Sequence, residues 1–433
     1  MENNNNIKAV VLAAGKGTRM KSSMPKVLHS IFQKPLVGWV LDAIESISDT
    51  IESIVIVGHG ADDVEKYLQK NYKNAKTALQ KEQLGTGHAV SMAIPLLKDF
   101  DGEVLITCGD TPLITSDTLK KFIKYHKEQN SDLTVMTTLF DNPFGYGRIV
   151  RNEQNEVSEI VEQKDATEVQ KQIKEVNTGI YLLNWKKTNR AFSELKNTNA
   201  QGEYYLTDII KWAKESRLKV CGYVASDNNE IYGINSRQNL AVATKIMNER
   251  KLNELMENGV TIVDTFSTFV SPETQIDSDT IIYPNTYIEG KNTISKNCKI
   301  GPMAHFRGNC TVGQNCKIGN FVELKNAKIS DNTNVCHLSY VGDAVLGKNV
   351  NIGAGTIFAN YNSITKEKKS SILADGVSIG SNSVIVAPVE LGKDAFVAGL
   401  SCITKDVEEN SLAITRASQK EIKNWVKTKK ENK

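Results

Sequence analysis

The stretch that decides the fold is residues 276–324, IDSDTIIYPNTYIEGKNTISKNCKIGPMAHFRGNCTVGQNCKIGNFVEL, in which an aliphatic or aromatic residue returns at every sixth position. The same spacing continues, with two five-residue steps and one interruption, as far as Ile403. A small residue such as Thr280, Cys298 or Ala304 stands four places after most of these positions. A period of six fits neither an α-helix nor simple strand alternation. It is typical of a parallel β-helix, whose short strands and tight turns stack coil upon coil.

This solenoid is expected to place three hexads in each coil, giving about seven coils that each rise about 4.8 Å. The aliphatic residue and its small partner should point inward, and Gly, Asn and Asp should form the turns. Cys298, Cys310 and Cys316 occupy the small inward position, where a free thiol acts as a compact apolar filler. The seven cysteines form no C-x-x-C pair, so the sequence does not predict a zinc site.

Length and composition set the broad class of the protein. A chain of 433 residues is too long for one core, which favours two domains and a connector. The charged fraction of 24% is ordinary for a soluble protein, and the net charge of +3 does not indicate a nucleic-acid partner. No apolar run reaches the ~20 residues that span a bilayer, and no secretory signal is recognisable. We therefore expect a cytoplasmic protein without a membrane partner.

The first half alternates short apolar runs with helical stretches. The expected strands are 7–14, 54–57, 104–107, 133–138 and 179–182, and the expected helices are 35–46, 62–71 and 116–128. This alternation indicates a mostly parallel sheet with helices on its faces. Because ligands bind beyond the carboxyl ends of such strands, residues 15–19 and Gly109–Asp110 should border one crevice.

The glycine-rich loop after the first strand, GKGTRM at 15–20, suggests a phosphate site. It is not a P-loop, and a dinucleotide fingerprint would need Gly in place of Met20. Its two glycines let backbone amides approach phosphate oxygens, and nearby cations would balance the charge. These cations are Lys16, Arg19 and Lys26. Asp110 suits Mg²⁺, which binds few protein carboxylates. Taken alone, the loop also fits a tight turn with solvated lysines, and Asp110 a turn or N-cap residue.

Several motifs together resemble a known family. LAAGKGTRM at 12–20 with Pro25–Lys26 is similar to the signature of sugar-1-phosphate nucleotidylyltransferases. The further motifs are Gln80, QLGTGHA at 83–89, GYGRI at 145–149, E-x-KDA at 162–166, NTG at 177–179 and QGEYY at 201–205. Over nearly the whole chain they resemble the bacterial bifunctional N-acetylglucosamine-1-phosphate uridylyltransferase / glucosamine-1-phosphate N-acetyltransferase family. The resemblance implies an α/β nucleotidyltransferase domain with a Rossmann-like, mostly parallel sheet, followed by a left-handed parallel β-helix of hexapeptide repeats.

For the first domain, the resemblance implies Mg²⁺-dependent uridylyl transfer from UTP to N-acetylglucosamine-1-phosphate with release of pyrophosphate. It places Leu12, Ala13, Ala14, Gly15 and Gln80 at the nucleotide, Gly85 and Thr86 at base and ribose, and Gly109 at the same crevice. It assigns Arg19 and Lys26 to the phosphates, Asp110 and Asn235 to Mg²⁺, and Gly147, Glu162 and Asn177 to the sugar. Such chemistry depends mainly on positioning and electrostatics.

For the solenoid, the resemblance implies acetyl transfer from acetyl-CoA to glucosamine-1-phosphate. It makes His337 the general base, because a neutral imidazole can take the proton of an attacking amine. Without the resemblance, a lone surface His would usually have no catalytic role. It assigns Arg307, Lys325, Tyr340, Asn351 and Lys368 to the sugar phosphate, with Lys366 as an alternative to Lys368. It assigns Ala354, Asn360, Tyr361, Ser381, Gly399 and Arg416 to acetyl-CoA. Residues 359–371 interrupt the repeat as a polar, basic insertion, which is either functional or a tolerated surface loop.

We expect a uridylyltransferase domain at 1–235, a linker helix at 236–258, an acetyltransferase β-helix at 259–416 and a basic tail at 417–433. The family resemblance also implies a homotrimer with acetyl sites between adjacent solenoids. The product, UDP-N-acetylglucosamine, would supply cell-envelope precursors. One alternative is a single-activity nucleotidylyltransferase whose solenoid only assembles or regulates. A second alternative is a non-catalytic scaffold. It is disfavoured by the presence of Arg19, Lys26 and Asp110.

Overall fold

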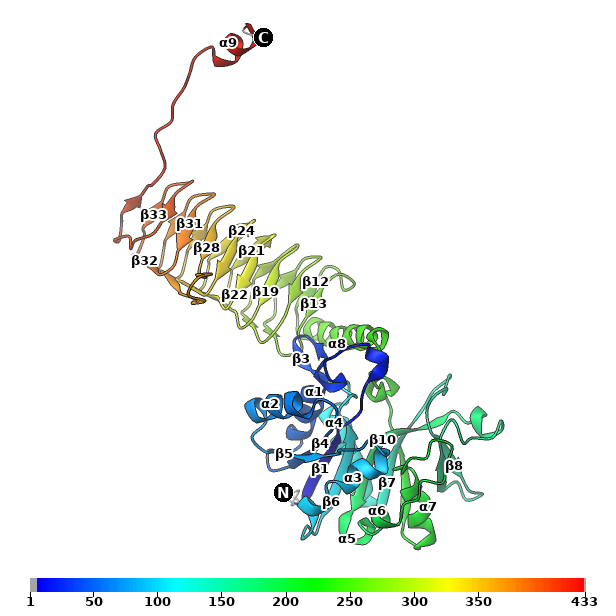
Figure 1. The fold of residues 1–433 in the computed structure, drawn as a ribbon. Coiled ribbons are helices and arrows are strands. Elements are labelled where there is room, and N and C mark those ends of the chain that lie inside the picture. Colours follow the sequence, from blue (N-terminus) through cyan, green and yellow to red (C-terminus); the bar gives the residue numbers. More distant parts are fainter. Residues whose placement is uncertain (1–5, 432–433) are drawn as a thin grey trace. The chain divides into compact units, whose positions relative to one another are not determined.

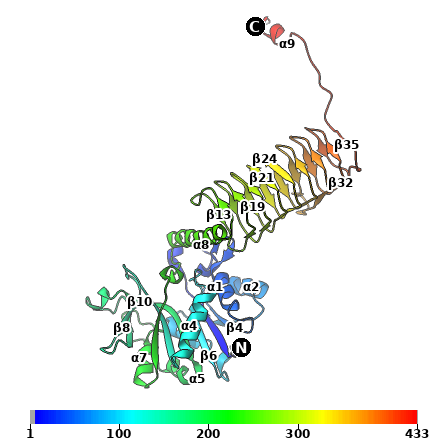
Figure 2. The same ribbon diagram turned by 180° about the vertical axis from the view of Figure 1, so that it is seen from behind.

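The computed structural model describes residues 6–431, so residues 1–5 of the expected first domain and 432–433 of the tail lie outside it. The chain forms two compact units that meet between Ile246 and Met247. Figures 1 and 2 show an α/β unit and a unit of stacked β-coils. Both predicted fold classes are confirmed. None of the helices among the described residues combines the length and apolarity needed to cross a membrane.

The first unit is built on a nine-stranded sheet whose central strands are mostly parallel. Its main path runs β11 (Val220–Val224), β7 (Leu133–Leu139), β10 (Glu175–Asn184), β6 (Glu103–Cys108), β1 (Ile7–Leu12), β4 (Glu52–Val57) and β5 (Ala75–Leu79), and the hairpin β8 (Arg148–Arg151) and β9 (Val157–Val161) branches from β10. β10 runs antiparallel to both β6 and β7, an exception that the apolar run at 179–182 did not reveal. β5, β8, β9 and β11 were not predicted.

Helices cover both faces of this sheet, because alternate strand residues enter two separate cores. Val10 and Ile106 lie in one core, whereas Ala9, Val11 and Leu105 lie in the other. The predicted helices form as α1 (Leu36–Glu45), α2 (Ala61–Asn71) and α4 (Ser116–Glu128), all against the second core. The opposite face carries α3 (Thr86–Ser91), α5 (Trp185–Thr188), α6 (Ala191–Glu194) and α7 (Asp208–Glu215). Short 3-10 helices occupy Thr18–Met20, Lys26–Leu28, Ile94–Leu97, Gln170–Gln172 and Asn228–Ile231, and β2 (Ser30–Ile31) pairs with β3 (Lys34–Pro35).

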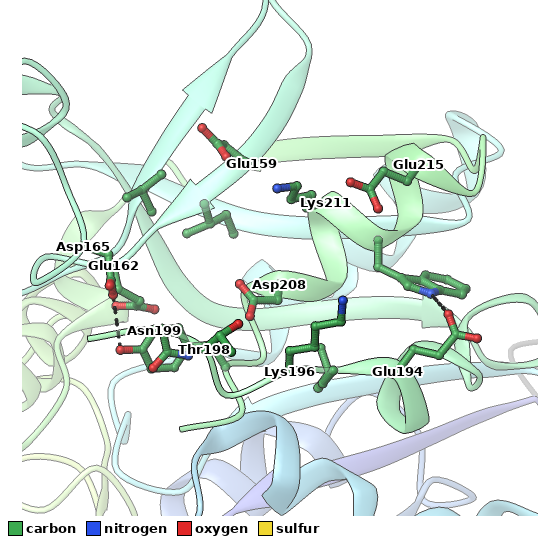
Figure 3. A pocket seen from close by; sticks show the side chains of 15 residues that line it. Glu159, Glu162, Asp165, Glu194, Lys196, Thr198, Asn199, Asp208, Lys211 and Glu215 are labelled. Carbon is green, nitrogen blue, oxygen red and sulfur yellow. Dashed lines mark hydrogen bonds between the residues drawn. The ribbon is translucent and has the colours of Figure 1, made fainter. Parts of the chain in front are cut away.

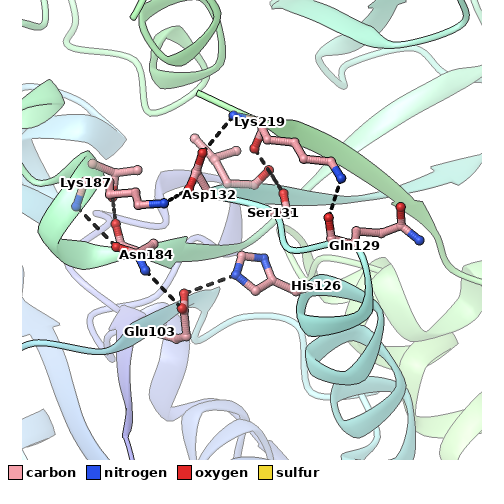
Figure 4. A network of polar contacts seen from close by, with 10 residues as sticks. Glu103, His126, Gln129, Ser131, Asp132, Asn184, Lys187 and Lys219 are labelled. Carbon is pink, nitrogen blue, oxygen red and sulfur yellow. Dashed lines mark hydrogen bonds and ion pairs between the residues drawn. The ribbon is translucent and has the colours of Figure 1, made fainter. Parts of the chain in front are cut away.

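A buried polar network joins several elements where β6 and β7 begin, at the edge opposite the glycine-rich loop (Figure 4). His126 on α4 lies 3.1 Å from a carboxylate oxygen of Glu103 and 2.7 Å from the hydroxyl of Thr134. Asp132 accepts hydrogen bonds from the ammonium of Lys187 and the backbone N–H of Lys219. These contacts satisfy polar groups that would be costly to bury alone.

Helix α8 (Arg237–Glu257) runs from the first unit into the second. Leu252 and Leu255 pack into the solenoid core. The buried amide of Asn248 accepts from the N–H of Val270 at 2.9 Å and donates to the carbonyl of Thr268 at 2.8 Å. The helix ends before Gly259, whose φ of +88° gives the left-handed turn common after helix C-termini.

The second unit is a parallel β-helix with three sheets that each run along the stack. The first sheet contains β12 (Thr261–Ile262), β15 (Ile281–Ile282), β18 (Lys299–Ile300), β21 (Lys317–Asn320), β24 (Asn334–His337), β27 (Asn351–Ile352), β30 (Ser378–Ile379), β33 (Phe396–Val397) and β35 (Leu412–Ala413). The second contains β13 (Phe269–Val270), β16 (Tyr287–Ile288), β19 (His305–Arg307), β22 (Glu323–Lys325), β25 (Tyr340–Gly342), β28 (Ile357–Ala359), β31 (Val384–Val386) and β34 (Cys402–Ile403). The third contains β14 (Gln275–Ile276), β17 (Thr293–Ile294), β20 (Thr311–Val312), β23 (Lys328–Ile329), β26 (Ala344–Leu346), β29 (Ser371–Leu373) and β32 (Val389–Leu391).

The hexad spacing sets the register of these coils. Ile281 pairs with Lys299 and Lys299 with Lys317, a step of three hexads. The aliphatic residues and their small partners are buried as predicted, including Cys298, Cys310 and Cys316. Coiling begins earlier than the predicted Ile276, because β12 and β13 already stack on later coils, so the sheets reach nine, eight and seven strands among residues 6–431.

The insertion lies between β28 and β29 and lengthens one coil without disturbing the stack. Asn351 of β27 still pairs with Ser378 of β30, and Phe358 with Ile385. Within the insertion, Tyr361 and Lys368 form an isolated antiparallel bridge. After β35 the chain is exposed as far as the short helix α9 (Trp425–Glu431).

Two candidate active sites

The first site lies where β1 and β6 end side by side. Leu12 pairs with Cys108, and the N–H of Gly109 donates to the carbonyl of Leu12 at 2.9 Å. A Cβ on Gly109 would lie 3.3 Å from that oxygen, so the close approach of the two strand ends favours Gly. This pairing brings the glycine-rich loop and Asp110 to one crevice, as the predicted parallel sheet requires.

A cavity of about 260 Å³ opens at this crevice, and a larger one of about 470 Å³ lies against β9 and α7. The smaller one is lined by nine residues proposed for the nucleotide and metal: Leu12, Ala13, Ala14, Gly15, Lys26, Gln80, Gly85, Thr86 and Asp110. Gln80 is buried and donates from Nε2 to the carbonyl of Gly85 at 3.1 Å. Gly85 has a φ of +114°, and a Cβ there would meet the backbone of Tyr204 at 2.6 Å. The conformation of this wall therefore depends on Gly85.

Lys26 connects the loop with the two predicted metal ligands. Its ammonium forms an ion pair with Asp110 and lies 3.2 Å from Oδ1 of Asn235. The N–H of Ile234 donates to the carbonyl of Asp110 at 2.9 Å, which holds the segment of Asn235 against β6. A carboxylate and an amide oxygen thus converge on one cation, the donor set that suits Mg²⁺. The described residues contain no group of three or more His, Cys, Asp or Glu arranged for a metal.

The three predicted sugar residues come together, and one of them, Glu162, lines the larger cavity (Figure 3). The N–H of Asn177 donates to the carbonyl of Gly147 at 2.9 Å, and a Cβ on Gly147 would lie 3.3 Å from Oε1 of Glu162. Burial raises the pKa of Glu162, the hydroxyl of Thr207 opposes that shift, and neighbouring carboxylates add to it. Chief among these neighbours are Asp165 and Asp208.

Five residues that sequence reasoning gave no role also line the smaller cavity, namely Val27, Gln83, Ala89, Cys108 and Glu203. Burial raises the pKa of the Cys108 thiol to about 12, which keeps it neutral beside Asp110. Glu203 stands in the quoted QGEYY motif, the only signal that pointed to it. Arg19 is exposed on the loop and is not among the lining residues.

The second site follows one corner of the solenoid. His337 ends β24, and its carbonyl accepts from the N–H of Gly355 at 3.2 Å. The carbonyl of Ala354 accepts from Asn382, and that of Ser381 from Leu400. His337, Ala354, Ser381 and Gly399 therefore occupy equivalent corner positions in successive coils. The repeat converts four residues distant in sequence into one column, with the predicted general base at its start.

A group of cations lies on the neighbouring sheet. Arg307 pairs in register with Lys325, and Arg307 also donates to Glu323 at 2.8 Å. Burial, Lys368 of the insertion and Arg307 together lower the pKa of Lys325. Mutual repulsion of three cations favours a bound anion such as a phosphate. Lys366, the alternative to Lys368, occupies a turn of the insertion with a φ of +61°.

Tyr340 lies next to this cation group and is positioned by the predicted residue Asn360 and by Asp343 and Gly342, which the sequence did not single out. Its hydroxyl donates to Oδ1 of Asn360 at 3.5 Å, and Asn360 donates to Asp343 at 2.5 Å. A Cβ on Gly342 would lie 2.3 Å from the hydroxyl of Tyr340. Gly342 stands in register with Lys325, so the absence of a side chain there makes room for the Tyr340 ring.

The remaining predicted residues of the second site lie outside the corner column of His337. Tyr361 is exposed and lines a cavity of about 360 Å³ formed largely by the insertion. Asn351 is exposed on β27, on the same sheet as His337. Arg416 is exposed and follows Thr415, whose hydroxyl accepts from the N–H of Cys402.

Comparison with known proteins identifies the family of this chain. Residues 8–230 match the nucleotidyl transferase family model, and residues 288–411 match the model of the GMPPB C-terminal domain. A protein of Brevibacillus brevis named bifunctional protein GlmU is 44% identical over 446 residues, which cover 95% of each chain. Proteins of the same name from Caldanaerobacter subterraneus subsp. tengcongensis and Clostridioides difficile are 44% and 43% identical, covering 96% and 98% of this chain and 97% and 98% of theirs. The chain belongs to the GlmU family. This membership confirms the resemblance on which the predicted residue roles depend.

Proposed function

We propose that the two sites of this GlmU family member carry out the two halves of UDP-N-acetylglucosamine synthesis. The chain is a bifunctional enzyme that acts on small-molecule substrates. The solenoid acetylates glucosamine-1-phosphate with acetyl-CoA, and residues 1–235 couple the resulting N-acetylglucosamine-1-phosphate to UTP. The observation that carries this assignment is the presence of two separate cation-rich sites in one chain, one at Lys26 and one at Lys325.

In the uridylyl site, a phosphate oxygen of the sugar phosphate attacks the α-phosphorus of UTP and pyrophosphate leaves. The cavity lined by Gly15, Gln80 and Thr86 holds the nucleotide, and Glu162 and Asn177 orient the sugar. Arg19 and Lys26 neutralise charge that develops on the leaving pyrophosphate, the main contribution proteins make to such reactions. Asp110 and Asn235 would hold Mg²⁺, which supplies charge neutralisation at the phosphates when it is bound.

In the acetyl site, His337 is the general base. The amino group of glucosamine-1-phosphate must lose a proton as its nitrogen attacks the thioester carbon. The imidazole accepts this proton, and the imidazolium returns it to the sulfur when the carbon–sulfur bond breaks, so that CoA leaves as the thiol. Arg307, Lys325 and Lys368 bind the sugar phosphate beside Tyr340. Asn351 completes the set at the sugar phosphate. Ala354, Ser381 and Gly399 continue the column of His337 and would border acetyl-CoA, together with Asn360, Tyr361 and Arg416.

The corner that bears His337 also suggests the assembly. The residues that follow its column positions include exposed apolar side chains in left-handed turns, Met303, Phe321, Leu338 and Leu400. Leu338 is 61% exposed and Leu400 64% exposed, although such turns favour Gly or Asn. A second copy of the solenoid would cover this ridge, and the expected homotrimer would place each acetyl site between neighbours. We also place the enzyme in the cytoplasm, where UTP and acetyl-CoA are available.

Two substitutions test the division of labour. His337→Ala should lower acetyl transfer by about 10²–10⁴-fold and leave uridylyl transfer near the wild-type rate. Asp110→Ala should abolish Mg²⁺-dependent pyrophosphate release and leave CoA release intact. A folded variant that loses both activities would contradict the assignment of independent sites.

The single-activity alternative, with a solenoid that only assembles or regulates, makes a different prediction. It requires pyrophosphate release from UTP but no CoA release with glucosamine-1-phosphate. The cations at Lys325 argue against it, because a purely structural coil has no need of three mutually repelling cations. Assaying both half-reactions on one purified sample decides between the two functions.

A further inference from the structure

We propose that Lys26 is an exchangeable occupant of the magnesium position. Its ammonium holds Asp110 and Asn235 until the triphosphate of UTP draws it away, which couples metal binding to nucleotide binding. This inference rests on the proposed uridylyl function and adds a control element to that site.

The contacts of Lys26 carry the first step. Its ammonium is paired with Asp110 and lies 3.2 Å from Oδ1 of Asn235. The side chains of Lys26 and Asp110 are only 15% and 17% exposed, so water competes poorly for the pair. The two oxygens proposed for Mg²⁺ are therefore already directed at a positive charge.

An ammonium and Mg²⁺ compete for these oxygens. Mg²⁺ requires its oxygen ligands at about 2.0–2.1 Å in octahedral geometry. A divalent ion bound to Asp110 would repel a lysine ammonium at the same carboxylate. Each cation therefore weakens binding of the other, so the pairing with Lys26 opposes binding of the metal alone.

The surroundings of Lys26 indicate where its ammonium would move. The stem of Lys26 packs beneath the glycine-rich loop, because a Cβ on Gly17 would lie 2.7 Å from Cβ of Lys26. Lys26 and Gly15 line the same cavity. Rotation of the side chain alone therefore turns the ammonium from Asp110 towards phosphates held at the loop. Nucleotide binding would satisfy the lysine and release Asp110 and Asn235 together.

Mn²⁺ is the probe for the test, since electron paramagnetic resonance measures its binding to the full chain without nucleotide. Lys26→Met keeps the length of the side chain and removes the charge. It should tighten Mn²⁺ binding at least tenfold. Arg19→Met is the matched control, because it removes a cation of the same loop that does not line the cavity. It should change the affinity less than threefold.

A second comparison fixes the place of the effect. In the double variant Lys26→Met/Asp110→Asn the gain in Mn²⁺ affinity should disappear, because the Asp110 carboxylate that Lys26→Met would free is no longer present. Lys26→Gln provides an independent variant, and circular dichroism verifies the fold of each. The proposal is overturned if the Lys26 variants bind Mn²⁺ no more tightly than Arg19→Met, or if the gain persists without Asp110. Pyrophosphate release by the wild type is measured on the same material, so a failure of the uridylyl function is recognised separately.

Discussion

Substitution of Gly342 by Ala should damage the acetyl site through Tyr340 and leave the rest of the chain intact. The new Cβ would lie 2.3 Å from the hydroxyl of Tyr340, 2.5 Å from its Cζ and 2.8 Å from Nδ2 of Asn360. Contacts below 3.0 Å cannot persist, and the flexible end of the Tyr340 side chain is the part that can move. The backbone of Gly342 has no positive φ, so Ala introduces no conformational strain of its own.

The size of the effect follows from the hydrogen bond that Tyr340 is proposed to give to the sugar phosphate. A hydrogen bond to a charged group contributes about 1.5–3 kcal/mol. At about 1.4 kcal/mol per tenfold change, its loss lowers kcat/KM by roughly 10- to 150-fold. The assay is release of the CoA thiol at varied glucosamine-1-phosphate concentration. Pyrophosphate release from UTP should stay near the wild-type rate.

A double-mutant cycle isolates the cause. In the Tyr340→Ala background the added methyl group has no ring to displace, so Gly342→Ala should lower acetyl transfer less than threefold further. The reasoning is refuted if the single variant Gly342→Ala retains acetyl transfer within twofold of the wild type. It is also refuted if the effect is equally large without the Tyr340 side chain.

Three further predictions concern stability and pH. Phe306→Ala should lower the free energy of unfolding of the solenoid by about 3–5 kcal/mol, because the Phe306 side chain is fully buried. Val345→Ala, at a half-exposed position, should lower it by less than about 1 kcal/mol. Urea denaturation measures both changes. Asn248→Ala should cost about 1–3 kcal/mol by leaving the buried N–H of Val270 unpaired, and equal urea midpoints for variant and wild type would contradict this. Burial raises the pKa of Glu162 above its ordinary 4.5, so its contribution to stability is complete below pH 4.5 and is lost as pH rises through the raised pKa. Glu162→Gln, which does not titrate, should therefore gain stability relative to the wild type as pH rises from 4.5 to neutrality, and a constant difference across that range would show that the shift is absent.

The sequence alone was sufficient to predict features that arise from a local or repeated pattern of residues. The hexad at 276–324 determined the solenoid, its inward residues and its three-hexad coil, because each coil satisfies the same packing requirement as the last. The run at 7–14 and the loop after it located the crevice that we propose for the nucleotide, since strand ends and ligand sites coincide in parallel sheets. The roles of single residues came from motif resemblance, and they remain proposals.

Only the tertiary structure decided which distant residues meet. Nothing in the spacing of Lys26, Asp110 and Asn235 indicates that one ammonium contacts both oxygens. The antiparallel insertion of β10 into the sheet, the room that Gly342 leaves for Tyr340 and the column from His337 to Gly399 likewise depend on pairing across long stretches of chain. Sequence patterns record whether a residue favours burial or a turn, whereas contacts between segments are set by how whole elements pack, and that information is not local.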